Sequence, residues 1–163
     1  SFCRLQGVHT AVETTGCGSW DSLYEICRKT DLIYYDIKLL DSELHRKFTG
    51  MSNDVILRNL RRLSENREAV GEIVVRIPCI PGINDHKEQI EQTARFVSEL
   101  KLSFLELLPY NEAAGAKYMW LFQDYSLQKL HTRKKEYYEE LQKYVSQFGL
   151  LPYGLGHGRR KEK

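Results

Sequence analysis

The chain has 163 residues, a length that suits one domain with its own hydrophobic core. Hydrophobic residues make up 42% and charged residues 28%, and the net charge of +2 comes from a basic end, because the last five residues carry +3. The nearly neutral body excludes an extended basic face for nucleic acid, and no apolar run approaches the roughly 20 residues that span a membrane. The start has no signal-peptide pattern, so we expect a cytoplasmic protein.

The four cysteines stand at positions 3, 17, 27 and 79. None of their spacings matches CxxC or CxxxCxxC, so the chain's own residues predict no zinc or iron–sulfur site. Because the cytoplasm keeps thiols reduced, we expect all four cysteines to be free.

Strand-like runs alternate with longer helical runs along the chain. Residues 31–38 are almost continuously apolar, as expected of a parallel strand that is buried on both faces. Asp85 and Glu88 have capping-box spacing, and Ser126 is expected to cap a last helix with an apolar stripe from Leu130 to Phe148. In chain order we predict the end of a helix at 1–6, a strand at 7–14, a helix at 19–29, a strand at 31–38, a helix at 53–65, a strand at 72–78, a helix at 85–101, a strand at 104–109 and a helix at 126–149.

This alternation predicts an α/β fold, with about four parallel strands and flanking helices in a single domain over residues 1–163. Such units form either a small open sheet or part of a (β/α) barrel, and periodicity alone does not choose between the two. In both arrangements ligands bind at the carboxyl ends of the strands, so the polar residues there are the candidates for a site.

Asp36 and Lys38 are the first of these candidates, because they interrupt an otherwise apolar strand. Their i, i+2 spacing directs both side chains to the same face. The two charges either converge on a ligand or form a structural ion pair, and the residues alone leave both interpretations open.

The other strand ends carry four further candidates, each with two interpretations. Glu13 and Thr14 either offer oxygen atoms to a hard cation or a ribose, or cap the next helix. Arg76 either binds a carboxylate or phosphate, or forms a salt bridge. Asn111 either contacts a base or ribose, or occupies a turn.

Five segments of the chain resemble motifs that occur in the same order in glycyl-radical-enzyme activating enzymes. This family of radical S-adenosylmethionine (SAM) proteins includes the pyruvate formate-lyase activating enzymes. Each motif is weak alone, but five in order over residues 1–125 make the resemblance specific. The segments are GVHTAVETTG at 7–16, LIYYDIK at 32–38, DSELHRKFTG with SN at 41–53, VRIP with IPGIND at 75–85, and ELLPY with a later G and KY at 106–118.

The resemblance implies a SAM site that includes Thr14, Asp36, Lys38, Arg76 and Asn111. Lys38 would lie near the methionyl carboxylate, and Arg76 would face SAM or the substrate peptide. Asn111 stands where the family often has a histidine near the adenosine.

The resemblance also implies a monovalent-cation site beside the cofactor. Its ligands would be Glu13, Thr14, Asp36 and the backbone carbonyl of Tyr34. Thr15 replaces the commoner Asn of this motif, which weakens the match at that point.

The family's CxxxCxxC cluster loop and GGE motif are absent, so the chain resembles the C-terminal portion of a partial barrel of about six strands. The resemblance implies that the full-length enzyme binds a [4Fe–4S] cluster through cysteines outside this chain and cleaves SAM to a 5′-deoxyadenosyl radical. That radical would take hydrogen from a glycine of a partner such as pyruvate formate-lyase, with electrons from flavodoxin or ferredoxin. This chain alone would be inactive, and its first strand would have an open edge.

Two other functions remain open on the residues alone. One is a complete small aldolase-like enzyme that uses Lys38 as a Schiff-base nucleophile. The other is a non-enzymatic module that docks a partner. The sequence does not identify which glycyl radical enzyme an activase of this kind would serve.

Overall fold

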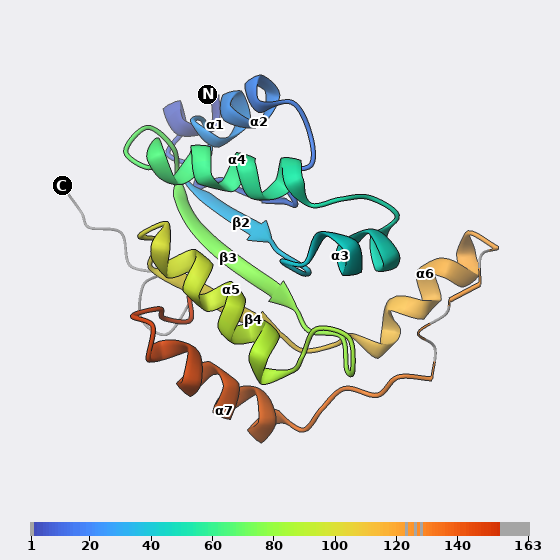
Figure 1. The fold of residues 1–163 in the computed structure, drawn as a ribbon. Helices are drawn as coiled ribbons and strands as arrows, with labels where there is room; N and C mark the ends of the chain where they lie inside the picture. Colours follow the sequence, from blue (N-terminus) through green and yellow to red (C-terminus); the bar gives the residue numbers. More distant parts are fainter. Residues whose placement is uncertain (1, 123, 126, 128, 154–163) are drawn as a thin grey trace.

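A computed structural model describes residues 2–122, 124–125, 127 and 129–153 of the chain. Four strands alternate with helices, which confirms the predicted α/β class (Figure 1). The elements are α1 (Phe2–Leu5), β1 (Ala11–Thr14), α2 (Trp20–Cys27), β2 (Leu32–Asp36), α3 (Ser42–Thr49), α4 (Asp54–Glu65), β3 (Glu72–Pro78), α5 (Lys87–Glu99), β4 (Phe104–Leu108), the 3-10 turn η1 (Glu112–Ala114), α6 (Gly115–Trp120) and α7 (Lys135–Ser146).

The four strands form one sheet in the order β1-β2-β3-β4, and every neighbouring pair is parallel. Sequential order with helical crossovers brings all four carboxyl ends to one edge of the sheet. Helices α3 and α6 lie at this edge, toward which the strand arrows point (Figure 1). The candidate residues of β1, β2 and β3 therefore share one end of the molecule.

The main hydrophobic core lies on one face of the sheet only. Ile33, Tyr35, Val75 and Leu105 point to this face and pack with apolar residues of α2, α4, α5 and α7. Among the described residues, the opposite face, called here the inner face, carries only a small cluster of Leu32, Val74 and Phe104, against which Tyr34 and Tyr153 pack. Helices that cover a single face are typical of a (β/α) barrel wall rather than of a doubly wound sheet.

Helix α3 is an element that the sequence patterns did not predict. Asp41 accepts a hydrogen bond from the Leu44 amide at 2.7 Å, which caps the helix at its start. Gly50 ends the helix with φ of 83°, a conformation that glycine adopts without strain. The segment has only eight residues, and its one buried residue is His45. Besides the two caps, Leu44 and Phe48 have the i, i+4 spacing of a helix, so the sequence did carry a short signal.

Two predictions about helix starts are wrong. Helix α7 begins at Lys135, and residues 130–134 have no regular structure, so Leu130 is not part of its apolar stripe. Ser126, the expected cap, lies outside the described residues. Asp85 makes no capping box for α5, because its carboxylate accepts hydrogen bonds from the Gly82 amide and from Arg133 instead.

The two edges of the sheet differ. Within the described residues β1 pairs only with β2, so its outer edge is open, as predicted. At β4, Leu151 exchanges backbone hydrogen bonds with Ser103 and Leu105. The Gln142 side chain on α7 then donates to the Leu105 carbonyl at 2.9 Å and accepts from the Leu107 amide at 3.4 Å. A side-chain amide thus takes the place of a fifth strand beside β4.

Among the described residues, no helix has the length and apolarity that crossing a membrane requires.

Gly16, directly after β1, gives a test of this packing. It has φ of +67°, and an added Cβ would collide with the hydroxyl of Tyr35, which is fully buried and donates to the Ile56 carbonyl at 2.7 Å. We expect Gly16→Ala to lower the free energy of unfolding by about 2–4 kcal/mol in urea denaturation, from overpacking and left-handed strain together. Gly18→Ala, which meets open space, should cost under about 1 kcal/mol. Equal losses in the two variants would contradict this account.

Candidate functional site

Charged residues line up across the carboxyl half of the inner face. Glu13 is in register with Tyr34, and Asp36 with Arg76, which is itself in register with Glu106. Because Tyr34 and Asp36 are two residues apart on β2, all five side chains share one face. We call Glu13, Tyr34, Asp36, Arg76 and Glu106 the inner-face cluster.

Arg76 holds this cluster together. Its Nε donates to Asp36 at 2.9 Å and its Nη1 to Glu13 at 3.0 Å, while its guanidinium lies 4.6 Å from the centre of the Tyr34 ring. The Arg76 side chain is only 10% exposed, compared with 22% for Asp36 and 68% for Glu13. The guanidinium therefore connects β1, β2 and β3 at their carboxyl ends.

The pKa values of the cluster follow from these contacts. Burial disfavours the charged form of Arg76, but hydrogen bonds to Glu13 and Asp36 outweigh this cost and raise its pKa further above neutrality. The hydrogen bond from Arg76 lowers the pKa of Glu13. Burial raises the pKa of Glu106, and the nearby charge of Arg76 opposes this only in part. At neutral pH the cluster therefore contains a permanently charged guanidinium, a carboxylate hydrogen-bonded to it at Glu13, and a partly buried carboxylate at Glu106.

Lys38 lies two residues beyond the end of β2 and is half-buried. Among the described residues it forms no ion pair, and Asp36 pairs with Arg76 instead. The interpretation of Asp36 and Lys38 as a structural ion pair is therefore wrong, whereas the salt-bridge interpretation of Arg76 describes this structure. At the carboxyl edge of the sheet, the Lys38 ammonium group is thus unpaired within the part of the chain that the structure describes.

The remaining candidates lie away from the cluster. Thr14 belongs to the opposite face from Glu13 by strand alternation, and its hydroxyl accepts from the Gly16 amide at 3.0 Å. Asn111 is exposed and accepts from the Ala113 amide at 3.0 Å, so it starts the turn η1. Asn111 thus occupies a turn, as its alternative interpretation described, whereas Thr14 makes a local contact but does not cap the next helix, which is capped by Ser19.

Buried amide side chains position the loops around the site, and the sequence patterns did not single them out. The Asn84 amide donates to the carbonyls of Lys38 at 2.7 Å and Pro78 at 2.9 Å, while its oxygen accepts from Ile80 at 2.6 Å. Asn53 donates to two carbonyls that follow Lys38, at positions 39 and 40. Lys38 is therefore held through its backbone, not through its side chain.

Glu106 was also missed, although a signal for it existed. It interrupts the apolar strand β4 in the same way that Asp36 interrupts β2. Its carboxylate makes no hydrogen bond with any described residue. At both Asp36 and Glu106, a charged residue within an apolar strand was thus enough to mark a candidate site residue.

No group of three or more potential metal ligands occurs among the described histidine, cysteine, aspartate and glutamate residues. Burial raises the pKa of Cys27 to about 11 and that of Cys79 to about 12, so their thiolates are disfavoured at neutral pH. Cys17 is exposed and Cys3 partly so, and all four cysteines are free.

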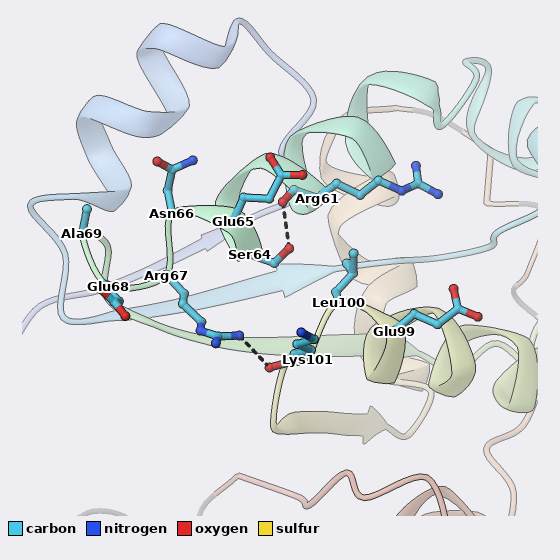
Figure 2. Close-up of a pocket in the computed structure, with 10 residues that line it drawn as sticks. All are labelled: Arg61, Ser64, Glu65, Asn66, Arg67, Glu68, Ala69, Glu99, Leu100 and Lys101. Atoms are coloured by element: carbon cyan, nitrogen blue, oxygen red, sulfur yellow. Dashed lines mark hydrogen bonds between the residues drawn. The ribbon is translucent and has the colours of Figure 1, made fainter.

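A cavity of about 590 Å³ lies at the other end of the sheet, between the ends of α4 and α5 (Figure 2). Exposed charges of both signs surround it, among them Arg61, Glu65 and Glu99, and Arg67 reaches the Lys101 carbonyl at 3.4 Å. It is at the amino ends of β3 and β4, where parallel barrels carry stability rather than chemistry. We therefore assign the candidate site to the inner-face cluster and Lys38.

Comparison with known proteins identifies the relatives of this chain, although no family model matches it. It is 34% identical over 145 residues to the trans-4-hydroxy-L-proline dehydratase activating enzyme of Clostridioides difficile, covering 88% of the chain and 47% of that protein. It is 42% identical over 118 residues to the isethionate sulfite-lyase activating enzyme of Oleidesulfovibrio alaskensis, covering 72% of the chain and 38% of that protein. By sequence, this chain is homologous to glycyl-radical-enzyme activating enzymes of the radical SAM class. It spans less than half the length of these two relatives.

Solved structures agree with this relationship. A domain of the pyruvate-formate lyase-activating enzyme from Bacteroides vulgatus superposes with a TM-score of 0.72 at 28% identity, over 93% of this chain and 83% of that domain. A radical SAM methyltransferase from Sphaerobacter thermophilus, with a TM-score of 0.62 at 14% identity over 90% of this chain and 41% of that one, shares the fold alone. The activating-enzyme homologue therefore has the partial-barrel fold of radical SAM proteins.

In this homologue, we expect each Arg76 contact to contribute to the free energy of unfolding in proportion to its burial. Arg76→Met leaves the mostly buried Asp36 carboxylate without its partner, so we expect the free energy of unfolding to fall by about 2–4 kcal/mol. Glu13→Gln should cost under about 1 kcal/mol, because the Glu13 side chain is 68% exposed. Chemical denaturation of both variants checks this, and a Glu13→Gln loss as large as that of Arg76→Met would contradict it.

The raised pKa of Glu106 predicts how the free energy of unfolding should change with pH. Above 4.5, the ordinary glutamate pKa, the unfolded chain loses its proton while the folded chain retains it. This group's contribution to stability therefore falls as pH rises toward the folded pKa and stays low above it. We expect Glu106→Gln to remove that fall, so the wild type should lose stability relative to the variant as pH rises from 4.5. A difference that grows in the opposite direction would contradict the burial of this carboxylate.

Proposed function

We propose that residues 1–163 form the C-terminal, SAM-binding domain of a radical SAM activating enzyme, whose full-length form generates a glycyl radical on a partner enzyme. The observation that carries this proposal is 34% identity over 88% of the chain to an enzyme named for activating another enzyme. The similarly sized domain from Bacteroides vulgatus supports the domain limits. Pyruvate formate-lyase is one partner of the kind we propose, and the cytoplasm is the compartment we propose.

The residues at the carboxyl edge fit the amino-acid part of SAM. SAM has a carboxylate, an ammonium and a sulfonium, and the site has cations and carboxylates in alternation. We assign Lys38 to the methionyl carboxylate, because its ammonium is free of ion pairs among the described residues and its backbone is fixed by Asn84. Asp36 would accept from cationic or donor groups of SAM. Arg76, whose Nη2 makes no hydrogen bond within the described residues, would present that nitrogen to SAM or to the substrate peptide.

Thr14 and Asn111 remain proposed cofactor contacts of a weaker kind. Each uses its side-chain oxygen in a local turn, so a contact with SAM would need either another lone pair or a change in the turn.

An iron–sulfur cluster does not fit the cysteines of this chain, because two are buried with raised pKa values and the four do not group. We propose that its ligands lie outside the chain and that its electrons come from a donor such as flavodoxin or ferredoxin. Together with the cluster, SAM would supply the radical chemistry. The role of this chain is to bind and orient SAM and to keep water from it, so the chain alone should be inactive.

The cation site formed by Glu13, Thr14, Asp36 and the Tyr34 carbonyl stays a prediction. Both of its carboxylates are bound by Arg76, and the Thr14 hydroxyl belongs to the other face. These residues do not fit a cation in this arrangement, and we derive no step through one.

SAM titration of the ¹⁵N-labelled chain tests the proposed site. We expect saturable shifts at residues 36–38 and 76 with a dissociation constant of about 1 mM or weaker, because no cluster is present to hold the methionyl group. Lys38→Ala should weaken binding about tenfold or more through loss of a charge-assisted hydrogen bond.

Lys101→Ala, at the opposite end of the sheet, is the matched control and should leave the affinity unchanged. Unaltered binding by Lys38→Ala, or shifts confined to the cavity around Lys101, would overturn the assignment. Micromolar binding by the isolated chain would contradict the need for a cluster.

A further inference from the structure

A second cavity, of about 480 Å³, opens beside the carboxyl end of β4, between this strand and α7. This volume is within the range of about 300–1,000 Å³ that is usual for ligand pockets. Leu107, Pro109, Tyr138 and Pro152 provide apolar walls, and Gln142 lies where its amide completes the edge of β4. The cavity shares Glu106 with the inner-face cluster, but its apolar walls belong neither to that cluster nor to the cavity in Figure 2.

Four charged residues also line the cavity, and three of them form ion pairs. Arg133 binds the fully buried Asp85 at 2.8 Å, and Lys135 binds Glu139 at 3.1 Å. Glu106 is the fourth, half-buried and without a hydrogen bond among the described residues. Arg76, its neighbour on β3, directs its hydrogen bonds to Asp36 and Glu13 instead.

A half-buried carboxylate without donors is costly unless a ligand supplies them. Burial raises the pKa of Glu106 and the nearby charge of Arg76 opposes this only in part, which agrees with a carboxylate that has no hydrogen-bonded partner among the described residues. The apolar walls favour an aliphatic stem, and the carboxylate favours a charged donor at the end of that stem. Arginine combines both features, and its guanidinium matches a carboxylate in two-point geometry.

We propose that this cavity, here called the β4 pocket, binds an arginine side chain of a polypeptide partner, with the stem against Pro109 and Pro152 and the guanidinium on Glu106. The choice of a polypeptide rests on the proposed function, since the relatives are named for activating other enzymes. The site itself rests on the geometry of β4 and α7. It would anchor the partner at the same end of the sheet as the inner-face cluster.

Titration of the ¹⁵N-labelled chain with N-acetyl-L-arginine amide, without SAM, tests the pocket. We expect saturable shifts at residues 106–107, 138 and 142, including the side-chain amide of Gln142. N-acetyl-norleucine amide, which has an aliphatic stem but no charge, should bind about tenfold more weakly, since a charge-assisted hydrogen bond contributes a tenfold or larger factor.

Glu106→Gln should weaken arginine binding about tenfold and leave norleucine binding unchanged. Glu106→Asp, which keeps the charge on a shorter side chain, should fall between the wild type and Glu106→Gln, and it replaces that variant if Glu106→Gln does not fold. Glu99→Gln, at the cavity of Figure 2, is the matched control and should bind like the wild type.

Equal binding of the two blocked amino acids, or insensitivity to both Glu106 variants, would overturn the proposal. Shifts centred on Glu13 and Asp36 would also overturn it, because arginine would then be replacing Arg76 at the inner-face cluster. Because the arginine titration is done without SAM, its result does not depend on whether Lys38 binds SAM. A failure of the proposed SAM site can therefore be distinguished from a failure of the β4 pocket.

Discussion

The guanidinium of Arg76 is placed where three parallel strands end, and its two carboxylate partners come from two different strands. A buried arginine needs such partners, because an unpaired charge on a mostly covered surface would cost several kcal/mol. Asp36 meets this need at the same register level, and Glu13 meets it from the strand beyond. The alignment of β1, β2 and β3 thus depends on the contact that also orients the donors of the candidate site.

Where backbone pairing between strands ends, side-chain amides supply hydrogen bonds to the backbone. Asn84 joins the segments after β2 and β3, and Gln142 completes the edge of β4. An amide offers a donor and an acceptor in the same spacing as a peptide group, so it can replace a strand neighbour without adding charge. The loops at the carboxyl edge can therefore be irregular and still leave few backbone groups without partners.

The fold was largely predictable from sequence because apolar periodicity reports burial on the helix-covered face. The strand at Glu72–Pro78 agreed with prediction to the residue, while α3 was missed because it is only eight residues long and buries a single residue, His45. The start of α7 was wrong because Leu130 continues the helical spacing although residues 130–134 are not helical.

The site was predictable in part. Charges within apolar strands marked Asp36 and Arg76, but spacing along one strand suggested Lys38 as the partner of Asp36. The actual partner is forty positions away, and only the register between strands reveals it. Asn84 and Gln142 were unpredictable for the same reason, since an amide in a loop or on a helix surface has no pattern of its own.

The difference between the two edges of the sheet limits how copies of the chain can pair edge to edge. Backbone pairing between copies needs an unpaired strand on each, and of the described strands β1 alone has a free edge, because Leu151 and Gln142 occupy that of β4. Two copies joined through β1 would lie antiparallel about a twofold axis and consume the free edge of each. Edge pairing through the described strands would therefore stop at two copies, whereas a sheet with both edges free can add copies into a fibre.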